Sequence, residues 1–306
     1  MQQIEQVIKN IKEIGYGKVE DAVNKPTLAH LLDRVMSLQH DTSNKLTGNV
    51  PFLNTGHDMV YNLQNKDLLF SKIILSHPVI RTVLMTFLND QWYRQIPPDK
   101  PNYILRSLLG RSGGPGAMPL HIDSFIPARG SFAWSMQVAV ILEDQLPENG
   151  CTLVVPGSHL KDRYASPSDL EAAKPLPSKT GDLVFWDSRL WHGATSNTSG
   201  KSRWSVIGTF GRWWLKQNYD LPRSLPQQIY AELSNEERAI MGFCSIPPID
   251  EFERIDIKAG YESLRKNVAE YTAILGEVAA AERIESFPVA KLFSRLAAPQ
   301  KDGLAQ

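Results

Sequence analysis

The stretch TGDLVFWDSRLWHGATSN, residues 180–197, provides the clearest prediction of local structure in this sequence. It opens with a Gly-Asp turn, continues with the apolar and aromatic run DLVFW, and ends in small polar residues. A short apolar run rich in β-branched and aromatic residues between turn signals is typical of a buried strand. The stretch therefore predicts a buried strand, followed by an aromatic segment that carries His192.

Segments of the same kind lie on both sides of this stretch. They are short, β-rich and separated by Gly, Pro, Asn and Ser: NYILRSL (102–108), FAWSMQVAVIL (132–142), CTLVV (151–155) and RWSVIGTF (203–210). Short strands separated by turns indicate a sandwich or barrel rather than alternating βαβ units. We therefore predict a β core over residues 101–215.

Helical patterns flank this core. Before residue 100, apolar residues recur at helical spacing in three places, and one helix is expected to begin at Pro78, since proline suits a first turn. Towards the C-terminus, Ser234 and Glu237 have the spacing of a capping box, and Gly242 is a stop signal. A further helix is expected over about 258–285.

No linker, internal repeat or low-complexity tract divides the chain. We therefore expect one domain over residues 1–296, mainly β with helical flanks. Its predicted parts are a helical region (1–100), the β core (101–215) and a second helical region (216–296), followed by a flexible tail (297–306).

The composition argues against several classes of partner. Lys plus Arg and Asp plus Glu each number 33, so the net charge is zero, without the basic excess of nucleic-acid or anionic-membrane binders. Cys151 and Cys244 are too few for a disulfide framework. The N-terminus lacks the apolar core of a signal peptide, and no apolar run approaches the roughly 20 residues of a membrane span. We expect a cytoplasmic protein with neither nucleic-acid nor membrane partners.

The segment MPLHIDSF (118–125) places His121 and Asp123 two residues apart. On an extended strand, side chains at this spacing point to the same face, so the imidazole and the carboxylate can converge on one ion. This short pattern is common and carries little weight alone. Its weight comes from His192, because two histidines and one carboxylate form the facial triad that binds Fe(II) and leaves coordination positions open. A structural zinc site would instead use four protein ligands, usually including cysteine.

Arg203 follows His192 by eleven residues and opens the strand RWSVIGTF. A buried arginine can bind a carboxylate through two parallel hydrogen bonds. Such a group suits the distal carboxylate of 2-oxoglutarate, whose keto-acid end would chelate the iron while O₂ takes a remaining position. Ser205 should share the face of Arg203 and add a hydroxyl donor.

At this point the sequence resembles the phytanoyl-CoA dioxygenase family of Fe(II)/2-oxoglutarate oxygenases. The resemblance rests on the H-I-D of residues 121–123, on ENGCTLVVPGSH (148–159), on TGDLVFWDSRLWHGATSN (180–197) and on the position of Arg203. The resemblance extends from about Glu5 to Gly242. Within the family, the chain looks most like members that tailor natural products. The resemblance implies a double-stranded β-helix, or jelly roll, of the cupin-like kind, packed by helices.

The resemblance also implies further contacts to 2-oxoglutarate. Thr152 matches a threonine that helps to hold this co-substrate in such members, and Asn62 matches an amide from the N-terminal region. Relatives often carry a glutamine just before H-x-D, where this chain has Met118-Pro119-Leu120. Gln137 is a candidate substitute, because a buried amide requires a hydrogen-bonding partner.

The expected activity is oxidation of a small molecule, with hydroxylation favoured over desaturation or rearrangement, in specialised metabolism. Related halogenases have Gly or Ala at the position of Asp123, so chlorination is not expected. Two alternatives remain open: a non-catalytic protein on the same scaffold, and a cupin-like metal protein that does not use 2-oxoglutarate. Neither requires Arg203. The helices after residue 242 are candidates for a homodimer contact.

Overall fold

The computed structural model describes residues 2–43, 59–92, 96–97 and 99–246. The helix expected over about 258–285 and the tail at 297–306 lie outside these residues. The extension of a single domain to residue 296, and a dimer contact beyond residue 242, therefore stay predictions.

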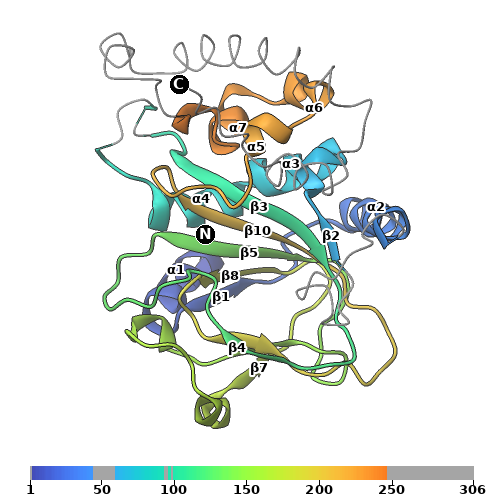
Figure 1. The fold of residues 1–306 in the computed structure, drawn as a ribbon, viewed down its shortest axis with the longest axis vertical. Coiled ribbons are helices and arrows are strands. Elements are labelled where there is room, and N and C mark those ends of the chain that lie inside the picture. Colours follow the sequence, from blue (N-terminus) through green and yellow to red (C-terminus); the bar gives the residue numbers. More distant parts are fainter. Residues whose placement is uncertain (1, 44–58, 93–95, 98, 247–306) are drawn as a thin grey trace, which may run out of the picture. The chain divides into compact units, whose positions relative to one another are not determined.

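Ten strands in the described residues form two antiparallel sheets (Figure 1). The large sheet contains, in spatial order, β1 (Tyr16–Val19), β8 (Leu183–Asp187), β5 (Ser135–Ile141), β10 (Ser205–Arg212), β3 (Tyr103–Arg111) and β2 (Met59–Tyr61). The small sheet contains β4 (Met118–His121), β9 (His192–Ala194), β6 (Thr152–Val154) and β7 (Lys174–Leu176).

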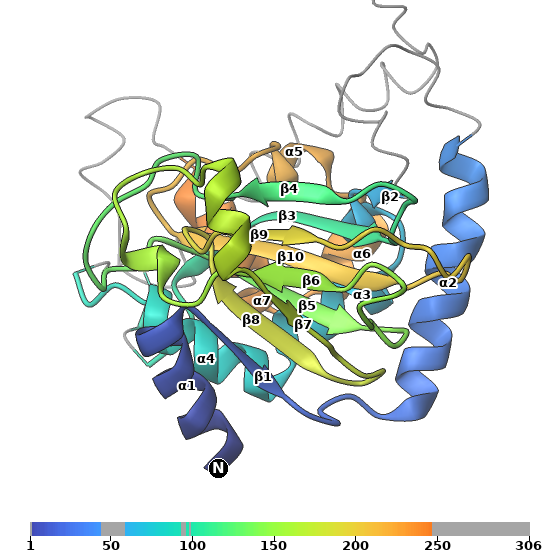
Figure 2. The ribbon, with the colours of Figure 1, turned by 90° about the horizontal axis from the view of Figure 1, so that it is seen from below.

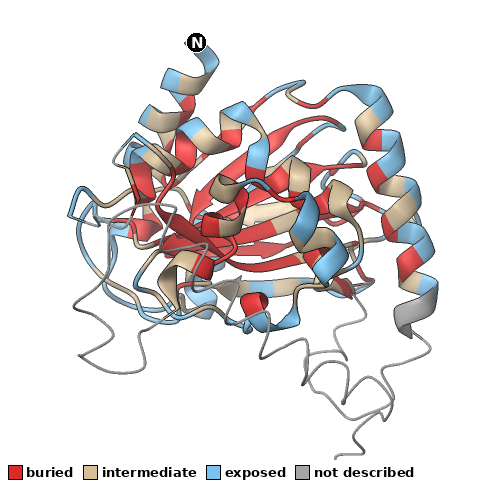
Figure 3. Ribbon diagram, turned by 90° about the horizontal axis from the view of Figure 1, so that it is seen from above, coloured by how far each residue is buried: buried red, intermediate tan, exposed pale blue. Residues whose placement is uncertain are grey.

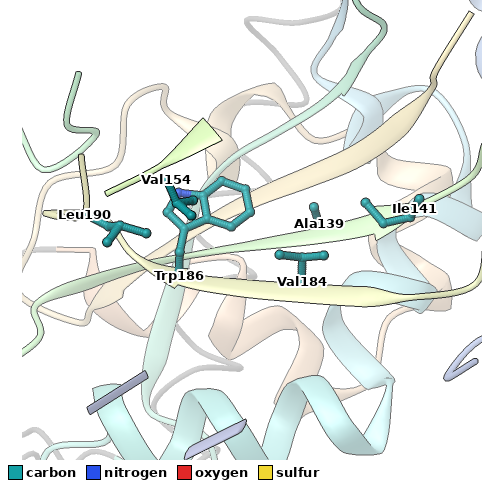
Figure 4. Close-up of a cluster of buried hydrophobic side chains, with 6 residues drawn as sticks. All are labelled: Ala139, Ile141, Val154, Val184, Trp186 and Leu190. Atoms are coloured by element: carbon teal, nitrogen blue, oxygen red, sulfur yellow. The ribbon is translucent and has the colours of Figure 1, made fainter. Parts of the chain in front are cut away.

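The two sheets face each other across a shared apolar core. Val154 of the small sheet packs in one buried cluster with Ala139, Val184 and Trp186 of the large sheet (Figure 4). Because side chains alternate along a strand, the next residues of β5 and β8 point to the opposite face. This two-sheet antiparallel arrangement is a jelly roll, and the predicted fold class is confirmed.

Helices pack on the large sheet and cover it (Figures 1 and 2). α1 (Gln2–Ile14) lies on β1 and β8, and α4 (Pro78–Leu88) lies on β3, β5 and β10. α4 begins at Pro78 as expected, and the five apolar residues of its stripe are buried: Ile80, Val83, Leu84, Phe87 and Leu88. Burial follows the same pattern throughout, on the strands and on the inward sides of the helices (Figure 3).

The remaining helices are α2 (Lys25–Ser43), α3 (Leu68–Ser76), α5 (Leu221–Ser224), α6 (Gln227–Glu232) and α7 (Asn235–Ile240). Single 3₁₀ turns occupy η2 (Leu63–Asn65), η3 (Ser158–Leu160) and η5 (Phe243–Ser245), and η4 (Pro167–Ala172) is longer. Among the described helices none is long and apolar enough to cross a bilayer alone; α3 and α4 pass that test only as a pair bent by 57°.

The C-terminal end of the described region follows the expected capping signals. Ser234 caps α7, accepting a hydrogen bond from the Glu237 N–H, while the Glu237 carboxylate accepts one from the Ser234 N–H. The helix ends before Gly242, which takes a left-handed conformation with φ 98°. A glycine adopts this conformation readily because it has no Cβ to clash.

The region expected to be mainly helical, residues 1–100, also contains two short strands. β1 and β2 lie in this region and form the two edges of the large sheet. The strands have only four and three residues, and β1, YGKV, contains a glycine, which weakens a strand pattern. Pairing with β8 and β3 supplies the hydrogen bonds that the local sequence does not predict.

Candidate metal centre

The three predicted metal ligands converge at one end of the small sheet. β4 and β9 are antiparallel neighbours, and His121 lies directly opposite His192, with ring centroids 4.3 Å apart. Asp123 follows β4, with Oδ1 3.6 Å from His121 Nε2 and Oδ2 3.2 Å from His192 Nε2. One ligand atom from each residue lies within 4.8 Å of the others, so the three can bind one ion.

Backbone carbonyls orient both imidazoles in the same way. His121 Nδ1 lies 3.0 Å from the Pro119 carbonyl, and His192 Nδ1 lies 3.0 Å from the Leu190 carbonyl. Since a carbonyl only accepts hydrogen bonds, each Nδ1 carries a proton, and Nε2 of the neutral imidazole is left to bind a metal. This is the tautomer that a metal-binding histidine requires.

Asp123 is held by the loop after β4 rather than by the strand itself. The N–H groups of Asp123 and Ser124 both donate to the Ser188 carbonyl, at 2.8 and 3.0 Å. Gln137 donates its amide N–H to Asp123 Oδ2 at 2.9 Å and accepts a hydrogen bond from the Thr209 hydroxyl at 2.7 Å. The predicted convergence of His121 and Asp123 is therefore found, although the strand ends at His121.

The charges of the three ligands are strongly coupled. Burial and the neighbouring His192 lower the pKa of His121 to about 4. Burial alone would raise the pKa of Asp123, but the two histidines outweigh it and lower this pKa to about 2. Burial likewise opposes protonation of His192, yet the charge of Asp123 and its hydrogen bond raise the pKa of His192. Near neutral pH, Asp123 is ionised and His121 is neutral, which suits a divalent cation.

We expect Gln137→Leu to weaken metal binding by about 10- to 100-fold, because the substitution removes the amide that orients Asp123. Titration of the purified protein with Co(II) under matched conditions measures this affinity. Thr209→Val is the graded control, since it removes only the support of Gln137 and should have a smaller effect. Equal affinity in wild type and Gln137→Leu would contradict this role.

Arg203 lies just before β10 and is 4% exposed. Its N–H donates to the Ser112 hydroxyl, but its side-chain Nε is buried without a hydrogen-bond partner. Burial, and then the charge of Arg111, lower the pKa of Arg203 to about 10, so it remains positively charged near neutral pH. Within the described residues no carboxylate pairs with it, and a buried guanidinium in this state is suited to receive an anion.

Two glycines leave room for this guanidinium. A Cβ at Gly113 would lie 2.5 Å from Arg203 Nε, and a Cβ at Gly150 would lie 3.1 Å from the same atom. Any side chain at Gly113 would therefore displace Arg203. An orphaned guanidinium N–H in a glycine-lined space fits the carboxylate of a 2-oxoglutarate-like diacid.

The strand register places Thr152 and Ser205, both predicted to contact 2-oxoglutarate, on the inward faces of the two sheets. Thr152 is two residues before Val154 on β6, so it shares the inward face of that core residue, and it lies opposite Ala194. Ser205 is opposite Arg111 and Ile141, and its hydroxyl lies 3.5 Å from the Arg111 carbonyl. Thr152 and Ser205 thus project from facing sheets.

Asn62 and Gln137, also predicted to contact 2-oxoglutarate, have different surroundings from those of Thr152 and Ser205. Asn62 follows β2 and takes a left-handed conformation, with φ 56°, before η2. The amide of Gln137 is committed to Asp123 and Thr209, as described above, rather than free for a co-substrate. Contacts of either residue with 2-oxoglutarate stay predictions.

Arg111 was not among the site residues predicted from the sequence. In the structure its side chain crosses from β3 to Met118 of the small sheet, with Nη2 3.0 Å from Met118 Sδ. The available signal was its place at the end of a mostly apolar segment, where a solvated arginine is less expected.

Comparison with known proteins supports the family resemblance. The profile described as Phytanoyl-CoA dioxygenase (PhyH) matches residues 11–205. The uncharacterized protein Rv1501 of Mycobacterium tuberculosis is 26% identical over 254 residues, covering 81% of this chain and 91% of that protein. Dioxygenase af480 of Aspergillus fumigatus is 23% identical over 249 residues, covering 78% of this chain and 76% of that protein.

A solved structure supports the fold. The epimerase SnoN, in complex with Fe3+, alpha ketoglutarate and nogalamycin RO, is 19% identical, with a TM-score of 0.53. The match covers 68% of this chain and 83% of SnoN. At this identity the likeness establishes the architecture only.

The family match spans more than half of the chain and contains His121, Asp123, His192 and Arg203. The chain therefore belongs to the phytanoyl-CoA dioxygenase (PhyH) family of non-haem iron, 2-oxoglutarate-dependent oxygenases.

Proposed function

We propose that this protein is a dioxygenase that uses Fe(II), 2-oxoglutarate and O₂ to hydroxylate a small molecule in natural-product biosynthesis. The observation that carries the proposal is a three-ligand metal centre in the same jelly-roll interior as a buried, unpaired arginine. Three protein ligands leave positions for a chelating co-substrate and O₂. When bound, the iron and 2-oxoglutarate supply the oxidising power that breaks a substrate C–H bond.

The residues of the chain bind and orient the reactants. His121, Asp123 and His192 hold the metal, and Gln137 fixes the carboxylate of Asp123. Arg203 receives the distal carboxylate of 2-oxoglutarate, with hydroxyl donors from Thr152 and Ser205 and an amide from Asn62.

The substrate is proposed to be largely apolar. The loop after Asp123 exposes Phe125 and Ile126, which are 66% and 65% exposed. Tyr164, from a different segment, donates its hydroxyl to the Phe125 carbonyl at 2.8 Å and is itself exposed. Large exposed apolar side chains beside a metal centre suit the hydrophobic surface of a substrate. The binding of nogalamycin RO by SnoN supports a natural product of this kind.

Anaerobic addition of Fe(II) and 2-oxoglutarate tests the proposal directly. We expect a metal-to-ligand charge-transfer band in the visible, which requires the keto acid to chelate iron held by the protein. A wild-type protein that binds Fe(II) without this band would instead be a metal protein that does not use 2-oxoglutarate. The succinate formed over a panel of apolar natural products then identifies the substrate.

A further inference from the structure

Arg111 ends strand β3 on the inward face of the large sheet. It lies opposite Ser205 of β10 on one side and Met59 of β2 on the other. Its guanidinium reaches the small sheet, where Nη2 contacts Met118 Sδ at 3.0 Å. Met118 begins β4, the strand that ends in the metal ligand His121. The positive charge of Arg111 is therefore held between the sheets, beside the strand that carries a metal ligand.

No salt bridge involves this guanidinium in the described part of the chain, although the carboxylate of Asp123 lies close enough to favour its charged form. Its Nε is buried without a hydrogen-bond partner, and the thioether of Met118 is only a weak acceptor. Burial lowers the pKa of Arg111, but an arginine remains charged even so. A buried N–H without an acceptor is costly, so a negatively charged ligand group that accepts a hydrogen bond from this Nε would satisfy it.

The electrostatic reach of Arg111 covers both halves of the proposed site. Its charge lowers the pKa values of His121 and Asp123 and opposes protonation of His192. It also lowers the pKa of Arg203. The geometry agrees, because Arg111 lies opposite Ser205, two residues after Arg203, and contacts Met118, three residues before His121.

We propose that Arg111 binds the metal-chelating carboxylate of 2-oxoglutarate, at the opposite end of the co-substrate from Arg203. This inference rests on the proposed function. 2-Oxoglutarate is a dianion, and Arg111 and Arg203 each have a buried Nε without a hydrogen-bond partner, one for each carboxylate. Arg203 has the glycine-lined space at its Nε, whereas Arg111 contacts the strand of His121, so each suits a different end.

Two probes separate the ends of the co-substrate. 2-Oxoglutarate carries both carboxylates, whereas 2-oxovalerate keeps the keto-acid end and has a methyl group in place of the distal carboxylate. Calorimetric titration of Zn(II)-loaded protein gives the Kd for each probe without turnover. The comparison uses wild type, Arg111→Gln and, as the matched control, Arg203→Gln.

We expect Arg111→Gln to raise the Kd of both probes by a similar factor, about 10- to 100-fold, because both probes keep the chelating carboxylate. Arg203→Gln should raise only the Kd of 2-oxoglutarate and leave that of 2-oxovalerate unchanged. Arg111→Lys should recover part of the lost affinity, since it restores the charge without the planar fork.

Wild-type affinity of Arg111→Gln for both probes would overturn the inference while leaving the proposed function intact. A loss confined to 2-oxoglutarate would also overturn it, because Arg111 would then serve the distal end. Failure of the wild-type protein to bind either probe would defeat the proposed function itself. Zinc content and melting temperature of each variant, with Arg111→Met as a second neutral substitution, separate loss of the fold from loss of the contact.

Discussion

Replacing Asp123 with alanine should lower the rate of 2-oxoglutarate-dependent oxidation on the order of 1000-fold or more, equivalent to about 4 kcal/mol of transition-state stabilisation. Asp123 is the only anionic ligand of the three, and its two oxygens face Nε2 of His121 and of His192. Without it, a divalent cation would be held by two neutral imidazoles and would bind far more weakly. Succinate formation and metal content, measured on the same samples, check both effects.

The matched control is Glu20→Ala, which removes a carboxylate that is 70% exposed and forms an ion pair with Lys18. It should leave both activity and metal content unchanged. Turnover of Asp123→Ala near that of wild type would show that the metal centre is assigned to the wrong residues. A melting temperature close to that of wild type ensures that the loss in Asp123→Ala does not arise from unfolding.

The second large effect is expected at Arg203. Arg203→Gln should raise the Kd of 2-oxoglutarate by about 100-fold, because it replaces a charged fork with a neutral amide in a buried site. The rate at saturating co-substrate should change much less, since Arg203 binds the end of the molecule that does not react. Initial rates over a range of 2-oxoglutarate concentrations separate the two constants.

The stability of the same variant provides an independent readout. Arg203 is buried without a carboxylate partner in the described residues, so its removal should not lower the free energy of unfolding of the ligand-free protein. The stabilisation normally conferred by added 2-oxoglutarate should largely disappear, because it follows the ratio of ligand concentration to Kd. A fully retained shift in melting temperature would mean that Arg203 does not contact the co-substrate.

The β core was predictable because its strands carry their own signals. The runs containing Phe185 and Val138 are apolar and bounded by turns, and both segments are strands of the large sheet. The partnership of His121 and His192 was also accessible, since the chemistry of an open iron site requires two histidines and a carboxylate. Their direct opposition across β4 and β9 could not be predicted from the sequence. The two histidines are 71 positions apart, and the pairing of their strands depends on the whole topology.

The residues that support the site were harder to predict. Gln137 was a candidate contact of the co-substrate, and that contact stays a prediction. Its observed hydrogen bonds to Asp123 and Thr209 depend on the strand register that places Thr209 opposite it, which the sequence does not reveal. Arg111 belongs to no local sequence motif, and its contact with Met118 of the small sheet is visible only in the structure. The edge strands β1 and β2 form through pairing with long central strands, which a local pattern cannot report.

The Ser188 carbonyl accepts hydrogen bonds from the N–H groups of both Asp123 and Ser124, and the chain becomes solvent-exposed at the next residue. Phe125 has a positive φ of 64°, and the next residues turn outward into solvent. The proposed metal ligand Asp123 is therefore held in place before the part of the loop that we propose contacts the substrate. Insertions and substitutions beyond Ser124 can accumulate without disturbing the ligand, so one catalytic centre can be adapted to new molecules through drift in a single loop.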